Sequence, residues 1–331
     1  AISGNTGGST GPHLHFEIRD TETEAALNPL NFGFAVADHR APEINKLLIY
    51  ALDSNHYCVP GQQKEFQVKK KEGKYSVENG IIEVNRSFVP KNGGIGYAVE
   101  VEDRYDMANN SCGIYEAIST INKKENFHYT IDRIPFEETR MVNELKDHAA
   151  YQRSNDHFQK MFRSPSNELS VYKSNIPGFI PFEQGIKHVD YIAKDHAGNS
   201  SRLSFDLKFE NTGKFLTPPI SNYPGKDHFF KGPGYHILVK KGSLYQPQVI
   251  STSTTGETFN FGDKYQGIEE PIHLEFIDEP DPKTYVEVST FKGKKKQFPL
   301  HCFSKSCTSQ LSNFGEISVL KDEYGPRINL I

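Results

Sequence analysis

Two histidines near the start of the chain, His13 and His15, have the residue type and the spacing to share a metal ion. Side chains alternate between the two faces of a β-strand, so both imidazoles would project from one face while Leu14 and Phe16 point into a core. Two neighbouring imidazoles can hold a metal ion and the water bound to it. The pair alone also fits two surface histidines on an edge strand. It therefore predicts half of a zinc hydrolase site.

The residues around this pair extend the pattern. A run rich in Gly, Ser and Thr covers 3–10, the sequence GPHLHFEIRD covers 11–20, and Asn28-Pro29-Leu30 follows. Glycine lets the backbone of a polypeptide substrate come close. Together these residues resemble the last motif of the lysostaphin-type (LytM-like) zinc endopeptidases. That resemblance implies an enzyme that cuts the peptide cross-links of peptidoglycan, often next to glycine.

The same resemblance implies roles for both histidines. His15 would be a zinc ligand, and His13 would be the catalytic general acid/base or the group that stabilises the transition state. The family's other ligands, in a His-x-x-x-Asp motif, lie upstream of His-x-His, whereas the match in this sequence, His128 to Asp132, lies downstream and is interpreted as chance. A catalytic zinc needs three protein ligands and a water. We therefore expect this chain alone to be inactive, with a missing N-terminal segment carrying the rest of the site.

Composition places the remainder of the chain among β-rich globular proteins. Its 331 residues suggest two to three domains, and 12% are aromatic, with many Tyr and Phe and no Trp. A net charge of −4 argues against nucleic acid as a partner. The basic runs at 69–71 and 292–296 are interpreted as solvated hairpin ends. Apolar runs fall short of about 18 residues, so no membrane span is expected.

Alternating hydrophobicity predicts strands along most of the chain. In the first half they are expected at 45–53, 64–69, 74–78, 95–103, 115–121, 127–134, 169–172, 188–195 and 202–210. Between 135 and 163, apolar residues recur at helical spacing, which predicts a helical insertion. A linker rich in Gly, Pro and Asn begins at 211, and short strands resume beyond it.

The turn at 195–200, Asp-His-Ala-Gly-Asn-Ser, resembles the final hairpin of bacterial Ig-like domains, and 103–110 is a looser version. Gly and Asn supply the positive φ angles that such turns need. Oxygen ligands at short spacing also suit calcium, so Asp103, Asp106 and Asn109 form either a calcium site or a plain turn.

The helical insertion carries a cluster of ionisable residues, namely His148, Asp156 and His157. It is either a second active site or a solvated surface, and surface histidines need no catalytic role. Among the four cysteines, Cys302 and Cys307 are close enough to bridge a hairpin, and Cys58 and Cys112 lie in one predicted domain and could meet. Because spacing alone does not prove pairing, each pair is either a disulfide or two free thiols.

The sequence thus predicts a mainly β protein in three parts. Residues 1–36 would be the C-terminal segment of a LytM-like peptidase domain, 37–212 an Ig-like β-sandwich with a helical insert near 135–163, and 213–331 a second β-sandwich. The expected function is that of a zinc endopeptidase homologue acting on peptidoglycan peptides in the cell envelope, whether periplasmic, associated with the outer membrane or secreted. The alternative is a non-catalytic scaffold, in which a degenerate peptidase domain docks within an envelope or outer-membrane protein complex.

Overall fold

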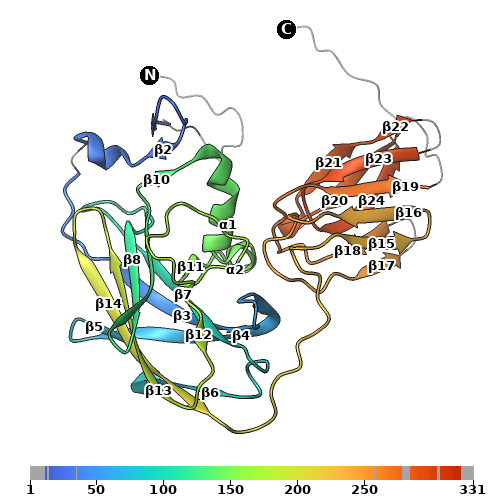
Figure 1. Ribbon diagram of the computed structural model, residues 1–331. Coiled ribbons are helices and arrows are strands. Elements are labelled where there is room, and N and C mark those ends of the chain that lie inside the picture. Colours follow the sequence, from blue (N-terminus) through green and yellow to red (C-terminus); the bar gives the residue numbers. More distant parts are fainter. Residues whose placement is uncertain are drawn as a thin grey trace.

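The computed structural model describes residues 12, 15–34, 36–255, 258–277, 284–303 and 306–321 (Figure 1). Strands make up 49% of the structure and helices 9%, which confirms the predicted mainly β, sandwich-like fold. Figure 1 shows two β-structures side by side, with helices α1 and α2 on the side of the first that faces the second. No helix in the described part of the chain is long and apolar enough to cross a membrane.

The first β-structure is an eleven-stranded sheet that folds over on itself. Its strands are β3 (Glu43–Leu52), β4 (Cys58–Lys71), β5 (Lys74–Val77), β6 (Ile81–Asn85), β7 (Gly94–Glu102), β8 (Glu116–Ile121), β9 (Lys124–Thr130), β11 (Phe158–Lys160), β12 (Ile180–Pro181), β13 (Gly185–Lys194) and β14 (Ser200–Glu210). The long strand β4 pairs with β3 up to Gln67 and with β5 from Val68 onward, so it joins the two halves. Tyr97 on β7 meets Phe205 on β14 across the core, with ring centroids 5.7 Å apart.

The insertion lies against the outer face of β3 and β7. It contains the 3-10 helix η3 (Phe136–Met141), α1 (Val142–Leu145) and α2 (His148–Ser154), followed by β11, which pairs with β7. Asp147 begins α2 by accepting a hydrogen bond from the backbone N–H of Ala150. Phe162 packs so closely on Gly96 that a Cβ there would lie 2.4 Å from its ring. The insertion is therefore fixed to the sheet.

One helix prediction and one strand prediction in the first β-structure are wrong, and strands β6, β11 and β12 were not predicted. Residues 158–160 form β11 rather than a helix, because the edge of β7 offers them backbone partners. Residues 169–172 form no strand, and Tyr172 makes only an isolated bridge to Tyr129. Strand β6, which the sequence did not predict, pairs parallel to β14.

The second β-structure is a sandwich of two five-stranded sheets. One contains β15 (His228–Gly232), β16 (Tyr235–Val239), β19 (Ile272–Phe276), β23 (Ser306–Leu311) and β22 (His301–Phe303). The other contains β17 (Thr252–Thr255), β18 (Thr258–Phe261), β24 (Gly315–Lys321), β20 (Thr284–Ser289) and β21 (Lys295–Pro299), with the short helix η4 (Phe291–Gly293) before β21. Tyr235 and Phe259 stack between the sheets, with ring centroids 3.9 Å apart.

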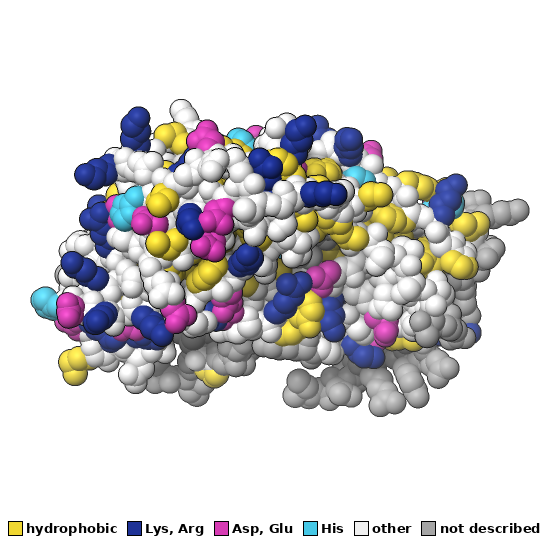
Figure 2. Space-filling view, turned by 90° about the horizontal axis from the view of Figure 1, so that it is seen from below, with side chains coloured by type: hydrophobic (Ala, Val, Ile, Leu, Met, Phe, Trp, Pro, Cys, Tyr) yellow, Lys and Arg dark blue, Asp and Glu magenta, His cyan; other side chains and the backbone are white. Residues whose placement is uncertain are grey.

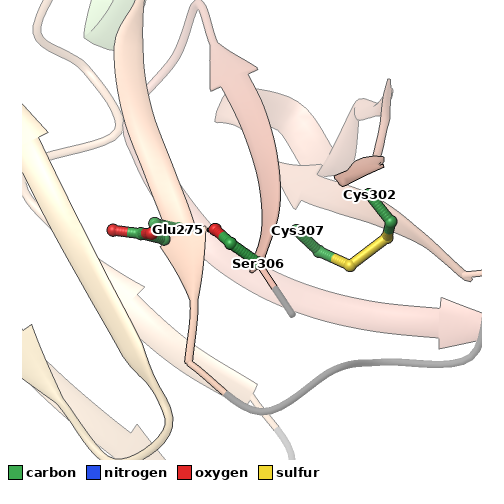
Figure 3. Close-up of a disulfide and its surroundings, with 4 residues drawn as sticks. All are labelled: Glu275, Cys302, Ser306 and Cys307. Carbon is green, nitrogen blue, oxygen red and sulfur yellow. Dashed lines mark hydrogen bonds between the residues drawn. A yellow bond between two sulfur atoms is a disulfide. The ribbon is translucent and has the colours of Figure 1, made fainter. Parts of the chain in front are cut away.

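A disulfide joins Cys302 on β22 to Cys307 on β23, which are direct partners in the strand register (Figure 3). Ser306 beside it donates a hydrogen bond of 2.8 Å to Glu275. Of the two alternatives that the sequence leaves open, Cys302 and Cys307 thus form the disulfide, and Cys58 and Cys112 are free thiols.

The segment at the N-terminal end joins the first β-structure through a small sheet of its own. Strand β2 (Ala26–Leu27) pairs with β1 (Ile18–Arg19) on one side and with β10 (Arg133–Ile134) on the other. The 3-10 helix η1 (Pro29–Phe32) follows β2.

On the face shown in Figure 2, acidic and basic side chains are interspersed.

Candidate functional site

His15 lies on the surface, immediately before strand β1. Its side chain is 70% exposed, and its Nε2 is 3.7 Å from a carboxylate oxygen of Glu17. A hydrogen bond from Arg19 lowers the pKa of Glu17. The described strand starts only at Ile18, because β2 offers just two residues for pairing. His15 therefore precedes the strand on which the sequence placed it, and His13 lies outside the described residues.

Large apolar side chains of the N-terminal segment also face solvent. Phe16, Phe32, Phe34 and Val36 are each between 49% and 59% exposed. Phe16 and Phe34 contact each other, with ring centroids 5.1 Å apart. A cluster of this kind on a short segment is characteristic of a surface that packs against further protein.

Asn31 anchors this segment to the first β-structure. Its side-chain amide donates to Asp132 at 2.5 Å, and its side-chain oxygen lies 2.7 Å from Nε2 of His196. A cavity of about 470 Å³ lies along this junction, lined mainly by apolar side chains that include Leu27, Leu30 and Ile134. His128 and Asp132, the downstream His-x-x-x-Asp match, have separate partners. Asp132 contacts Asn31, and Nε2 of His128 lies 2.8 Å from a carboxylate oxygen of Glu116.

Three carboxylates converge close to the same junction: Asp38, Asp103 and Asp195. Asp38 precedes β3, Asp103 follows β7, and Asp195 opens the turn between β13 and β14. Each offers an oxygen within 4.8 Å of the other two, and their residues are only 3–9% exposed. The sequence left Asp103, Asp106 and Asn109 as either a calcium site or a plain turn. The carboxylate of Asp106 lies 2.6 Å from Nδ1 of His39, which favours the plain turn.

Two of these carboxylates are incompletely hydrogen-bonded. Oδ2 of Asp38 and Oδ1 of Asp103 are buried and have no hydrogen-bond partner. Burial, together with the negative charges of Asp38 and Asp195, raises the pKa of Asp103 to about 6. The group is thus a buried concentration of negative charge.

A second buried acid group lies in the cleft between the two β-structures. Lys160 lies 3.6 Å from the carboxylate of Glu144, and the hydroxyl of Tyr50 donates to Asp147 at 2.6 Å. Although burial disfavours the ammonium form, the nearby acids keep the pKa of Lys160 above its ordinary value. Gln246 of the second β-structure also donates to Glu144. This acid group therefore has a cation and donors from the chain itself.

The cleft holds a cavity of about 470 Å³ whose lining includes His148 and the free thiol of Cys58. Burial lowers the pKa of His148 and raises that of Cys58 to about 12. The other members of the predicted histidine cluster lie apart. Asp156 binds Lys46 at 2.7 Å, and His157 packs on Tyr151. The structure does not assemble a second active site from these residues.

The described donor atoms near His15 are too few to form a catalytic zinc site by themselves. Within the described ranges, one group of three His, Cys, Asp or Glu side chains has ligand atoms close enough to share an ion, and it consists of Asp38, Asp103 and Asp195. Zinc hydrolases use three protein ligands, usually with histidine among them, whereas an all-carboxylate set suits a hard cation. Among the described residues, His15 belongs to no such group of three, and the carboxylate of Glu17 is 3.7 Å from its Nε2.

Comparisons of this chain with protein-family models, with curated proteins and with solved structures found no match.

Proposed function

We propose that this chain is the C-terminal part of a cell-envelope zinc endopeptidase homologue of the lysostaphin type, acting on peptidoglycan peptides. The observation that carries the proposal is the sequence GPHLHFEIRD at 11–20 with Asn28-Pro29-Leu30 after it. In the complete protein, His15 would hold zinc and His13 would assist catalysis. The other ligands would come from a His-x-x-x-Asp segment outside this sequence.

The surface of the N-terminal segment supports this proposal. Phe16, Phe32 and Phe34 are half exposed although they are large and apolar, and Phe16, next to the exposed His15 in sequence, contacts Phe34. The remainder of a peptidase domain would cover them and remove that apolar surface from water. Strand β2, which pairs with β10, would then connect the peptidase domain directly to the first β-structure.

The cysteines support a location in the cell envelope. Disulfides persist in oxidising compartments, and Cys302 and Cys307 form one. The two free thiols are poorly reactive, because burial raises the pKa of Cys58 to about 12 and that of Cys112 to about 11. This combination suits the periplasm or the outer face of the cell.

Contacts across the cleft support a positioning role for the two β-structures. The backbone N–H of Cys58 donates to the side chain of Gln246 at 3.0 Å, and Tyr223 donates to Asp53 at 2.8 Å. These contacts resist rotation of one β-structure against the other. The pair would thus hold the peptidase domain at a defined place in the envelope.

A second candidate function is a non-catalytic scaffold within an envelope or outer-membrane protein complex. The observation that favours it is the position of His15, which belongs to no group of three possible metal ligands among the described residues. In this case the N-terminal segment would belong to a degenerate peptidase domain that serves only for docking.

Metal content distinguishes the two functions. The protein would be purified at the full length that its gene encodes, as wild type, His15→Ala and the control His301→Ala, an exposed histidine on β22 of the second β-structure. Zinc would be measured by mass spectrometry, and release of peptides from glycine-containing peptidoglycan would be followed in parallel. A peptidase predicts one zinc per molecule and hydrolysis in the wild type and the control, with both lost in His15→Ala.

Equal zinc content in the wild type and in His15→Ala contradicts the ligand assignment. A wild-type protein that holds no zinc and releases no peptide, yet is retained by envelope proteins, supports the scaffold and rejects the peptidase.

A further inference from the structure

Asp38, Asp103 and Asp195 come from three separate loops at one end of the first β-structure. Two oxygens bound to the same calcium ion, each about 2.4 Å from it, are at most about 4.8 Å apart. One carboxylate oxygen from each of these three residues lies within 4.8 Å of one from each of the other two. Their spacing is thus compatible with one shared ion.

The buried oxygens of this group lack partners within the protein. Oδ2 of Asp38 and Oδ1 of Asp103 receive no hydrogen bond although both are shielded from solvent. An unpartnered buried carboxylate oxygen is strongly unfavourable unless a cation or a donor satisfies it. The two orphaned oxygens, which belong to different loops, therefore point to a ligand with positive charge.

The remaining contacts of the group come from neutral donors. Asp195 accepts from the backbone and the side-chain amide of Asn199, at 2.8 and 2.7 Å. Asp38 accepts from the backbone N–H of Arg40 at 3.1 Å. Cys112 lies 3.9 Å from Asp103 through its thiol. These contacts fix the directions of the carboxylates without neutralising their charge.

Basic side chains adjacent in sequence have other acidic or polar partners. Arg40 contacts Glu43 at 3.4 Å, and Arg104 contacts both Glu43 and Glu102. The two neighbouring histidines do the same, since His39 pairs with Asp106 and His196 with Asn31. None of the ion pairs recorded among the described residues includes a carboxylate of the group.

We propose that Asp38, Asp103 and Asp195 bind one calcium ion at the junction between the N-terminal segment and the first β-structure. Calcium accepts about six to eight oxygen ligands in flexible geometry, which suits carboxylates from three loops completed by water or backbone carbonyls. Magnesium demands stricter octahedral geometry and retains most of its waters, and zinc favours nitrogen and sulfur ligands. The all-oxygen set therefore selects calcium.

The ion would lock the junction. Asp38 lies on the connection that leaves the N-terminal segment, while Asp103 and Asp195 lie on loops at the ends of β7 and β13. A shared ion would restrain this connection against the sheet. The inference rests on the three carboxylates alone and not on the proposed peptidase function, so each can fail without the other.

The test uses the 331-residue chain, treated with a chelator and then dialysed free of it. Calcium chloride is titrated by calorimetry, and thermal unfolding is recorded with and without the ion. We expect one calcium per chain with a Kd below about 1 mM, and a Tm that rises by about 5 °C at calcium concentrations of about 100 times Kd. Asp103→Asn should weaken binding at least tenfold, whereas Asp106→Asn, on the same loop, should bind as the wild type does.

Weaker calcium binding in Asp103→Asn can be distinguished from a failure of this variant to fold. Asp103→Asn removes a buried like charge, so without calcium its Tm should equal or exceed that of the wild type. Absence of binding heat and of a Tm shift overturns the proposal. So does equal affinity for magnesium, or an Asp106→Asn variant that loses calcium as fully as Asp103→Asn does.

Discussion

Glu144 and Asp147 lie in the cleft between the β-structures, whereas Asp38, Asp103 and Asp195 lie at the junction with the N-terminal segment. Both groups are buried, yet their surroundings differ. Lys160 supplies a cation 3.6 Å from Glu144, and Tyr50 donates to Asp147. At the junction, the recorded partners are backbone and side-chain amides and a thiol.

The difference shows two ways to keep carboxylates away from water. Burying a charge is costly unless a counter-charge or hydrogen bonds compensate it. In the cleft, the chain itself provides a cation beside Glu144, although Oε2 of that residue has no hydrogen-bond partner. At the junction, the compensation is left to a dissolved cation, and that region's stability should depend on the solvent. Substitutions at the two places can separate these cases.

The largest effect is expected from Lys160→Met, which removes the cation and leaves Glu144 buried without it. Breaking one partner of a buried ion pair costs about 3–5 kcal/mol. We expect a loss of this size in the free energy of unfolding, measured by urea denaturation, and no recovery with calcium.

The double variant Lys160→Met, Glu144→Gln is the control for this substitution. Because it removes both charges, it should be more stable than Lys160→Met alone. A loss below about 1 kcal/mol in the single variant would mean that the cleft does not depend on its own cation, and the contrast between the two groups would disappear.

An intermediate effect is expected from the pH dependence of Asp103. Its pKa in the folded chain is raised from the model-compound value of 3.8 to about 6. Between these values the folded state holds a proton that the unfolded state has lost, so without calcium the contribution of Asp103 to stability falls as pH rises from about 4 to 6. Relative to the wild type, Asp103→Asn should gain about 1–2 kcal/mol between pH 4 and pH 7.

Urea denaturation of both proteins in a chelator, at several pH values, measures this difference. Saturating calcium should shrink this difference at pH 7, because the wild type binds the ion more tightly and gains more stability from it. A difference that stays constant from pH 4 to pH 7 would contradict the raised pKa and the accumulation of charge behind it.

The sequence predicted individual strands better than the tertiary contacts between them. The strands expected at 45–53 and 95–103 match β3 and β7 closely, because alternating apolar residues on a half-buried sheet are a local signal. Strand β11 was missed because its pairing with β7 is a tertiary contact. The same reason accounts for 169–172, where apolar residues fill the core without forming a ladder.

The group of Asp38, Asp103 and Asp195 could not be predicted from the sequence for a related reason. Asp103 was identified, but it was grouped with Asp106, its neighbour in sequence, because spacing along the chain was the available measure. Asp38 and Asp195 lie far away in sequence, and only the folding of the sheet brings their loops together. The signal that was present is that Asp103 and Asp195 each follow directly after a strand, at positions where loops gather at the end of a sheet.

The smallest effect is expected from an exposed ion pair beside the cleft. Arg153 on α2 contacts Asp263 of the second β-structure at 2.7 Å, and both side chains are well exposed, at 44% and 39%. Arg153 also lies over the ring of Tyr265. Exposed pairs contribute about 0.2–1 kcal/mol, so Arg153→Ala should lower the free energy of unfolding by less than about 1 kcal/mol.

Because salt screens exposed charges, that loss should shrink in about 1 M NaCl, whereas the loss in Lys160→Met should persist. An Arg153→Ala loss above about 2 kcal/mol that salt does not change would contradict this. It would mean that the Arg153–Asp263 pair is shielded from solvent like the buried pair of Lys160 and Glu144.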